Sequence, residues 1–159
     1  MTELMIPSYA NFGGKIHGGI LLSLMDKAAY ACASKHAGGY CVTVSVDGVG
    51  FLQPVEVGDL VSLHAAVHHA GRSSMLIGIK VLAESVMTGA VKHTNTSYFT
   101  MVAKGADERP RAVPGLTLVT QEEVRLFLEG VQRRELKGRY KEQLTALHTR
   151  LESEEDRGR

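Results

Sequence analysis

The hydrophobic pattern changes period once along the chain, from about 3.6 residues to 2, and this change limits the possible folds more than any other feature. Residues 18–36 carry apolar side chains at steps of three and four, which predicts a helix that ends at Gly38-Gly39. The following segments 41–52, 60–69 and 75–84 are β-branched or alternate apolar with polar residues, and segment 91–103 is rich in Thr, Tyr and Phe. They predict four strands.

Short turns join the last three of these strands, and one of the turns is Gly71-Arg72-Ser73-Ser74. Because parallel neighbours need crossovers of about a dozen residues, the strands are expected to pair antiparallel. The helix before them has a wide apolar stripe and few charges, so we expect it to be enclosed on most sides. The predicted fold is α+β, with a curved antiparallel sheet wrapped around one central helix.

The end of the chain has a different composition. Residues 121–159 hold 18 of the 35 charged side chains in the 159-residue sequence. Thr-Gln-Glu-Glu at 120–123 fits a capping box, and we expect a helical tail with breaks at Gly130 and Gly138. We therefore predict a domain over residues 5–118 and a charged helical extension over 119–159. Within this extension, residues 125–141 carry a local excess of basic side chains, which suits either a polyanion or a solvated helix that packs on a neighbouring subunit.

Several functional classes are disfavoured by composition. A net charge of +1, 6% aromatic residues and no Trp argue against nucleic-acid binding. The longest apolar stretch, 20–25, is too short to span a membrane, and the N-terminal residues do not resemble a secretory signal, so a cytoplasmic protein is expected. Cys32 and Cys41 match no metal or redox motif, and the strand histidines His68 and His69 should point to opposite faces, so no metal site is expected.

Four features could carry chemistry, each with a simpler alternative. Asp26 interrupts the apolar helix and is either a functional carboxylate or part of an exposed strip beside Lys27. His17-Gly18-Gly19 opens that helix, where free amides could stabilise an oxyanion or where the glycines only make a tight turn. Asn11 either forms an Asx-type turn or holds a water or carbonyl with its amide. The turn Gly71-Arg72-Ser73-Ser74 is either an ordinary hairpin turn or a phosphate contact.

Taken together, these motifs resemble the acyl-CoA thioesterases of the hotdog fold, the bacterial and cytosolic acyl-CoA hydrolase type. The resemblance extends over about residues 5–118, and it is carried by NFGGKIHGGILLSLMD at 11–26, VTVSVDGVGFLQPVEVGD at 42–59, GRSSM at 71–75 and HTNTSYFTMVA at 93–103. It implies a helix wrapped by a curved sheet. It also implies hydrolysis of an acyl-CoA to a free fatty acid and CoA without a metal or other cofactor, CoA being part of the substrate.

The resemblance further implies roles for individual residues. Asp26 would be the catalytic carboxylate, as a general base or as a nucleophile, and Asn11 would reach it across a dimer interface from the opposing subunit. His17, Gly18 and Gly19 would lie beneath the thioester carbonyl, and the turn Gly71, Arg72, Ser73 and Ser74 would meet the CoA nucleotide. The dimer would be the active unit, assembled as a trimer of dimers into a homohexamer.

Two other functions fit a chain of this kind. One is a hotdog dehydratase or hydratase that uses His17 and Asp26 as acid and base, which their nine-residue separation disfavours. The other is a non-catalytic module that binds acyl-CoA. Neither the acyl chain length nor the pathway can be inferred from the sequence.

Overall fold

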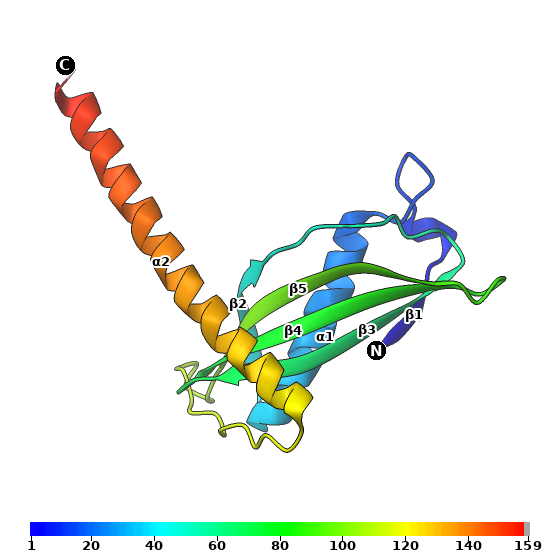
Figure 1. The fold of residues 1–159 in the computed structure, drawn as a ribbon, viewed down its shortest axis with the longest axis horizontal. Coiled ribbons are helices and arrows are strands. Elements are labelled where there is room, and N and C mark those ends of the chain that lie inside the picture. The colour runs from blue at the N-terminus through cyan, green and yellow to red at the C-terminus, as the bar shows by residue number, and fades with distance from the viewer. Residues whose placement is uncertain (158–159) are drawn as a thin grey trace. The chain divides into compact units, whose positions relative to one another are not determined.

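The computed structural model of the protein describes residues 1–157, with the side chains of residues 1–152. The chain divides into two compact units, Met1–Thr117 and a second unit that begins at Leu118. In the first unit one sheet and one long helix pack together, and in the second the chain forms a single helix (Figure 1).

The sheet of the first unit has five strands in the order β1-β3-β4-β5-β2, and each neighbouring pair is antiparallel. The antiparallel arrangement expected from the short turns is thus confirmed. Three of the strands lie close to their predicted positions, and β5 coincides with its predicted range. The strands are β1 (Thr2–Leu4), β2 (Cys41–Asp47), β3 (Asp59–Ala70), β4 (Ser74–Ser85) and β5 (Val91–Ala103).

Helix α1 (Gly18–Ala37) packs along the sheet, which curves around it (Figure 1). The predicted helix is therefore confirmed to within one residue. Gly38 ends α1 in the left-handed conformation with φ of 64°, which glycine adopts without a steric penalty. The Arg111 side chain then donates to the carbonyl of Ala37 at 2.6 Å, so a cation lies at the negative end of the helix dipole.

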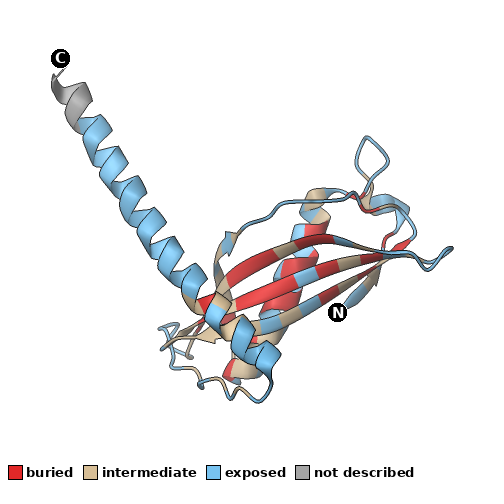
Figure 2. Ribbon diagram, viewed as in Figure 1, coloured by how far each residue is buried: buried red, intermediate tan, exposed pale blue. Residues whose placement is uncertain are grey.

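The hydrophobic core lies between α1 and the sheet (Figure 2). Leu24 and Met25 from α1 belong to the same core as Ile77 and Ile79 from β4 and Phe99 from β5, and all of them are buried. Each such side chain contributes about 1.5–3 kcal/mol relative to exposure. The core thus fixes α1 against β4 and β5, and with it the direction of every side chain on the helix.

The opposite face of α1 is open to solvent in the single chain. Leu22, Asp26, Lys27 and Tyr30 are all exposed on it. The expectation that other elements enclose α1 on most sides is therefore wrong for the single chain, because the sheet curves around only one side of the helix. Asp26 lies beside Lys27 on this exposed strip, and this position leaves its functional role open.

Strand β2 is shorter than the predicted 41–52 and changes register within its length. It ends before Gly48, whose φ of 67° leaves the extended region. A bulge lies between Thr43 and Ser45, so that Thr43 pairs with Met101 but Ser45 pairs with Thr100. A simple alternation would place the valines at 42, 44 and 46 on one side, but the extra residue reverses it, so Val42 and Val46 lie on opposite faces of the strand.

Two further elements differ from the prediction. Strand β1 pairs with β3, and its three residues are too few to produce a recognisable alternation. Helix α2 (Gln121–Arg157) runs through Gly130 and Gly138, so the predicted breaks are wrong. Each glycine costs about 1 kcal/mol, which helix-favouring neighbours and pairs such as Arg133–Glu129 at 2.9 Å offset.

The start of α2 confirms the predicted capping box. Thr120 Oγ1 accepts from the Glu123 amide at 3.1 Å, and Glu123 Oε2 accepts in return from the amide of Thr120 at 2.9 Å. None of the helices that the structure describes is apolar over a length that could cross a bilayer.

Candidate functional site

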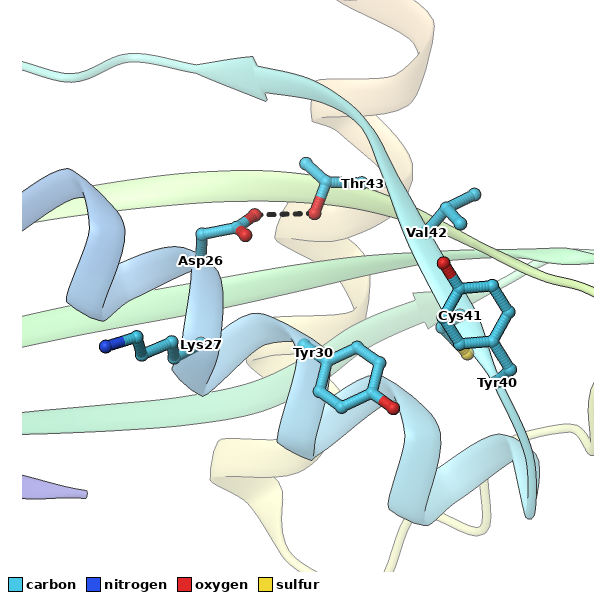
Figure 3. A pocket seen from close by; sticks show the side chains of 7 residues that line it. All are labelled: Asp26, Lys27, Tyr30, Tyr40, Cys41, Val42 and Thr43. Atoms are coloured by element: carbon cyan, nitrogen blue, oxygen red, sulfur yellow. Dashed lines mark hydrogen bonds between the residues drawn. The ribbon is translucent and has the colours of Figure 1, made fainter.

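An open pocket of about 420 Å³ lies between the outer face of α1 and the edge strand β2. Both elements supply its walls, and Figure 3 shows Asp26 and Thr43 facing each other across it, with the rings of Tyr30 and Tyr40 further along. The lining residues are Asp26, Lys27, Tyr30, Tyr40, Cys41, Val42 and Thr43.

The Asp26 carboxylate is held by one short hydrogen bond. Thr43 Oγ1 donates to Asp26 Oδ1 at 2.6 Å, the length expected for a hydroxyl bonded to a carboxylate. The Asp26 side chain is exposed to the solvent of the pocket. Its position in α1 and that of Thr43 in β2 are both fixed by the core, so the carboxylate has a defined orientation toward the pocket.

Thr43 is a site residue that the sequence reasoning missed. It pairs with Met101, whose side chain is buried in the core, so Thr43 lies on the face of β2 that is turned toward α1. The only signal in the sequence was its place in the alternation next to Val42, which by itself does not distinguish it from other strand threonines.

At the start of α1, His17 uses its side chain as a cap. Its Nδ1 accepts from the Gly19 amide at 2.9 Å, and its carbonyl accepts from the amide of Ile20. This satisfies two of the amides at the N-terminus of the helix. The amide of Gly18 is not used by the cap, so it is the one that a ligand could bind.

The space beside Gly18 is occupied by an aromatic ring. A Cβ built on Gly18 would lie 3.1 Å from the Phe51 ring. Phe51, in the segment after β2, thus packs so closely against Gly18 that a side chain at this position would be crowded. Phe51 was not singled out in the sequence.

Asn11 forms the Asx-type turn that was one of its two expected roles. Its Oδ1 accepts from the amides of Gly13 at 2.9 Å and Lys15 at 3.1 Å. Because the side-chain oxygen is used in this way, the group that remains to bind a ligand is the Nδ2 donor. Asn11 is exposed and is not among the residues that line the pocket with Asp26.

The turn Gly71-Arg72-Ser73-Ser74 joins β3 to β4, as a hairpin turn does. The Gly71 amide donates to the Ser74 carbonyl at 2.8 Å, and the Arg72 side chain is exposed. Ser74 and Val42 both pair with Val102 of β5. The turn therefore lies two strand spacings, about 10 Å, from the pocket strand.

The remaining candidates are thiols and metal ligands. Cys41 lines the pocket, and burial raises the pKa of its thiol, against smaller lowering effects of Ser34 and Arg111. Because a protonated thiol is a weak nucleophile, Cys41 does not suit a catalytic role. Burial also raises the pKa of Cys32. Within residues 1–157, no three His, Cys, Asp or Glu side chains gather in a metal-binding arrangement.

The chain matches known proteins over most of its length. The model of the family described as "Thioesterase superfamily" matches residues 13–105. Protein VdlD of Helicobacter pylori is 40% identical over 139 residues, which are 87% of this chain and 79% of that protein. A hexameric acyl-CoA thioesterase, solved without ligand, has a TM-score of 0.85 and 36% identity, and the match covers 88% of this chain and 90% of that one.

A second solved structure is the acyl-CoA hydrolase of Staphylococcus aureus, in complex with butyryl-CoA, CoA and CoA disulfide. It has a TM-score of 0.83 and 31% identity, with 93% of this chain and 91% of that one covered. Variants of that enzyme with alanine in place of an asparagine, an aspartate and a threonine have also been solved, and these three residues are spaced 15 and 17 positions apart. The fold and these matches together show that the chain belongs to the acyl-CoA thioesterase family of hotdog thioester hydrolases within the thioesterase superfamily.

Proposed function

We propose that this protein hydrolyses acyl-CoA thioesters to a free acid and CoA, with Asp26 as the general base that activates water. The observation that carries the proposal is the Asp26 carboxylate, held by Thr43 at 2.6 Å in an open pocket. A fixed carboxylate that faces a solvent-filled pocket has both the basic group and the access to water that hydrolysis needs.

A matching pattern in the Staphylococcus aureus hydrolase supports the same residues. Asn11, Asp26 and Thr43 are 15 and 17 positions apart, from 26 − 11 and 43 − 26, as are the asparagine, aspartate and threonine replaced in that enzyme. Thr43 joins Asp26 and Asn11 in the proposed site on this ground and on its hydrogen bond.

In the proposed reaction, Asp26 takes a proton from a water molecule while the water oxygen bonds to the thioester carbonyl carbon. The resulting tetrahedral intermediate collapses with cleavage of the C–S bond, and the proton passes from Asp26 to the departing thiolate. A free thiol has a pKa of about 8.5, so the thiolate leaves readily and the site needs no strong general acid.

The oxyanion of the intermediate needs hydrogen-bond donors. Two are offered by this chain: the Gly18 amide, which the His17 cap does not use, and the Nδ2 of Asn11, whose Oδ1 is held in its own turn. We propose that Asn11 comes from the opposing subunit. The His17 imidazole accepts from the Gly19 amide, and this engagement disfavours the dehydratase alternative, in which His17 would exchange protons with substrate.

The rest of the proposal concerns CoA and assembly. Backbone amides, two hydroxyls and the exposed Arg72 guanidinium in the turn 71–74 suit a nucleotide phosphate of CoA, and no other cofactor is required. We propose a dimer as the active unit, within a trimer of dimers, which the hexameric relative supports.

Replacement of Asp26 tests the proposed function directly. Asp26→Asn keeps the size of the side chain but removes its basicity, so kcat for thiol release from acyl-CoA should fall by about 10² or more. The matched control is Glu84→Gln, the same carboxylate-to-amide change at an exposed position of β4, which should leave kcat unchanged. An unaltered rate in Asp26→Asn would rule out its catalytic role, and no turnover by the wild type on acyl chains from C2 to C18 would favour a binding module.

Isotope labelling separates base from nucleophile. In a single turnover in heavy-oxygen water, a general base leaves the label only in the acid product. Label found in the Asp26 carboxylate would show that an anhydride with the enzyme had formed, and would replace the base mechanism. Measurable hydration of crotonyl-CoA would support the hydratase alternative instead.

A further inference from the structure

We infer that Tyr30 and Tyr40 form the end wall of the acyl-binding pocket and restrict the enzyme to acyl groups of up to about eight carbons. This inference rests on the proposed function, and it goes further by naming the substrate class and the residues that select it. It concerns the end of the 420 Å³ pocket that is remote from Asp26 and Thr43.

The two rings come from opposite walls of the pocket. Tyr30 is on α1, Tyr40 precedes the first residue of β2, and their ring centroids are 6.3 Å apart at an interplanar angle of 60°. This tilted geometry is one that aromatic pairs favour. In Figure 3 the rings lie on either side of the groove, at the end away from the Asp26–Thr43 hydrogen bond.

Neither ring is needed to complete the core. Tyr30 is 45% exposed and Tyr40 is 57% exposed, whereas the α1 residues that pack on the sheet, such as Met25 and Ala29, are fully buried. These two large aromatic side chains beside an open pocket leave about half of their surface exposed in the single chain. Binding of an apolar group against them is therefore favourable, because it removes further apolar surface from water.

The position of the wall sets the length of chain that fits. Tyr30 follows Asp26 by one turn, about 6 Å along α1, and Tyr40 precedes Thr43 by three residues, about 10 Å along the strand direction. An extended alkyl chain with C–C bonds of about 1.5 Å advances about 1.3 Å per carbon. A chain whose carbonyl is at Asp26 would therefore reach the rings after about five to eight carbons.

Removal of the rings should lengthen the preferred substrate. In wild-type enzyme, kcat/KM should fall between C8 and C12 acyl-CoA. In Tyr30→Ala/Tyr40→Ala the ratio of kcat/KM for C12 to that for C4 should rise about tenfold or more, since single methylenes in a fitted pocket already discriminate by about that factor. Phenylalanine at both positions keeps the ring volume and should keep the wild-type profile, whereas Tyr30→Trp should shift it toward shorter chains.

The control is Tyr140→Ala, which removes another exposed tyrosine, on α2, and should leave the profile unchanged. Melting temperature and oligomeric state are measured for every variant. A chain-length profile that is unchanged in the double alanine and tryptophan variants would overturn the inference. So would loss of assembly with an unchanged profile, which would assign the rings to subunit contact. A wild-type enzyme with no activity on any chain length would overturn the proposed function itself, and the inference with it.

Discussion

At the scale of single residues, one hydroxyl determines how the Asp26 carboxylate is presented. The bond from Thr43 occupies Oδ1 and leaves Oδ2 available to a water molecule. Thr43 does not need to touch the substrate for this purpose, so it acts as a positioning residue. Its effect should appear in the chemical step and not in substrate binding.

We therefore expect Thr43→Val to lower kcat by about 10- to 100-fold with little change in KM, because a hydrogen bond to a charged group contributes about 1.5–3 kcal/mol. Thr43→Ser keeps the hydroxyl and should restore most of the rate. Steady-state kinetics on one acyl-CoA measures both variants. A rise in KM at constant kcat, or no rescue by serine, would contradict the positioning role.

A second residue-scale prediction concerns the packing of the sheet. A Cβ on Gly78 would lie 2.3 Å from the ring of His68, which is buried. We expect Gly78→Ala to destabilise the protein by about 1–3 kcal/mol through overpacking, seen as a lower denaturation midpoint in urea. Gly115→Ala is the control, since nothing lies within 4 Å of the corresponding Cβ. Equal stability of the two variants would show that His68 moves aside freely.

At the scale of elements, the stability of the first turn of α2 depends on the protonation of the Glu123 carboxyl. Backbone donors from Thr120 and Val119 lower the pKa of Glu123 from its ordinary value. A carboxyl whose pKa is lower in the folded state stabilises that state above its unfolded pKa, and this contribution is lost as the pH falls through the folded pKa. The first turn of α2 should accordingly loosen in acid.

Amide hydrogen exchange measures this effect. Thr120→Ala should raise the exchange rate of the Glu123 amide about fivefold, which corresponds to about 1 kcal/mol for a lost N-cap. Glu123→Gln should make the exchange of this turn, corrected for intrinsic rates, less sensitive to pH below neutrality. If the wild type and Glu123→Gln showed the same pH dependence, the capping carboxylate would have no part in it.

The elements also show where a sequence pattern stops being informative. Long periodic segments were predicted correctly for α1, β3, β4 and β5 because burial on one face enforces the period. Strand β1 depends on pairing with β3, and the β2 bulge depends on β5, so neither is visible locally. The breaks predicted at Gly130 and Gly138 were wrong because propensity is summed over the whole helix.

At the scale of the whole molecule, one chain presents two incomplete surfaces side by side. The outer face of α1 is uncovered, and β2 is an edge strand on which Val44 is 55% exposed. Unpaired edges with apolar side chains are suited to association with another chain. Asp26 stands out in the sequence as a charge within an apolar helix, and in the structure it lies on this uncovered face of α1.

A complementation experiment tests whether the site is shared between subunits. Asp26→Asn and Asn11→Ala should each be nearly inactive alone. If Asn11 acts across the interface, denaturing and refolding an equal mixture should restore about a quarter of wild-type activity, because half of the dimers are then mixed and each has one intact site of two. Refolding either variant alone is the control. A mixture as inactive as its components would place both residues in the same chain.

Because of the bulge in β2, an insertion or deletion before Thr43 has a different effect from one at or after the bulge. Thr43 precedes the extra residue, and Ser45 follows it. Insertion or deletion of one residue at the bulge alters only the pairing beyond it, so Thr43 still faces the helix. Insertion or deletion of one residue between the end of α1 and Thr43 would turn the Thr43 hydroxyl to the opposite face of the sheet. The Asp26 carboxylate would then lose its hydrogen bond from Thr43. Over evolutionary time, the number of residues between Asp26 and Thr43 should therefore vary less than the identity of those residues.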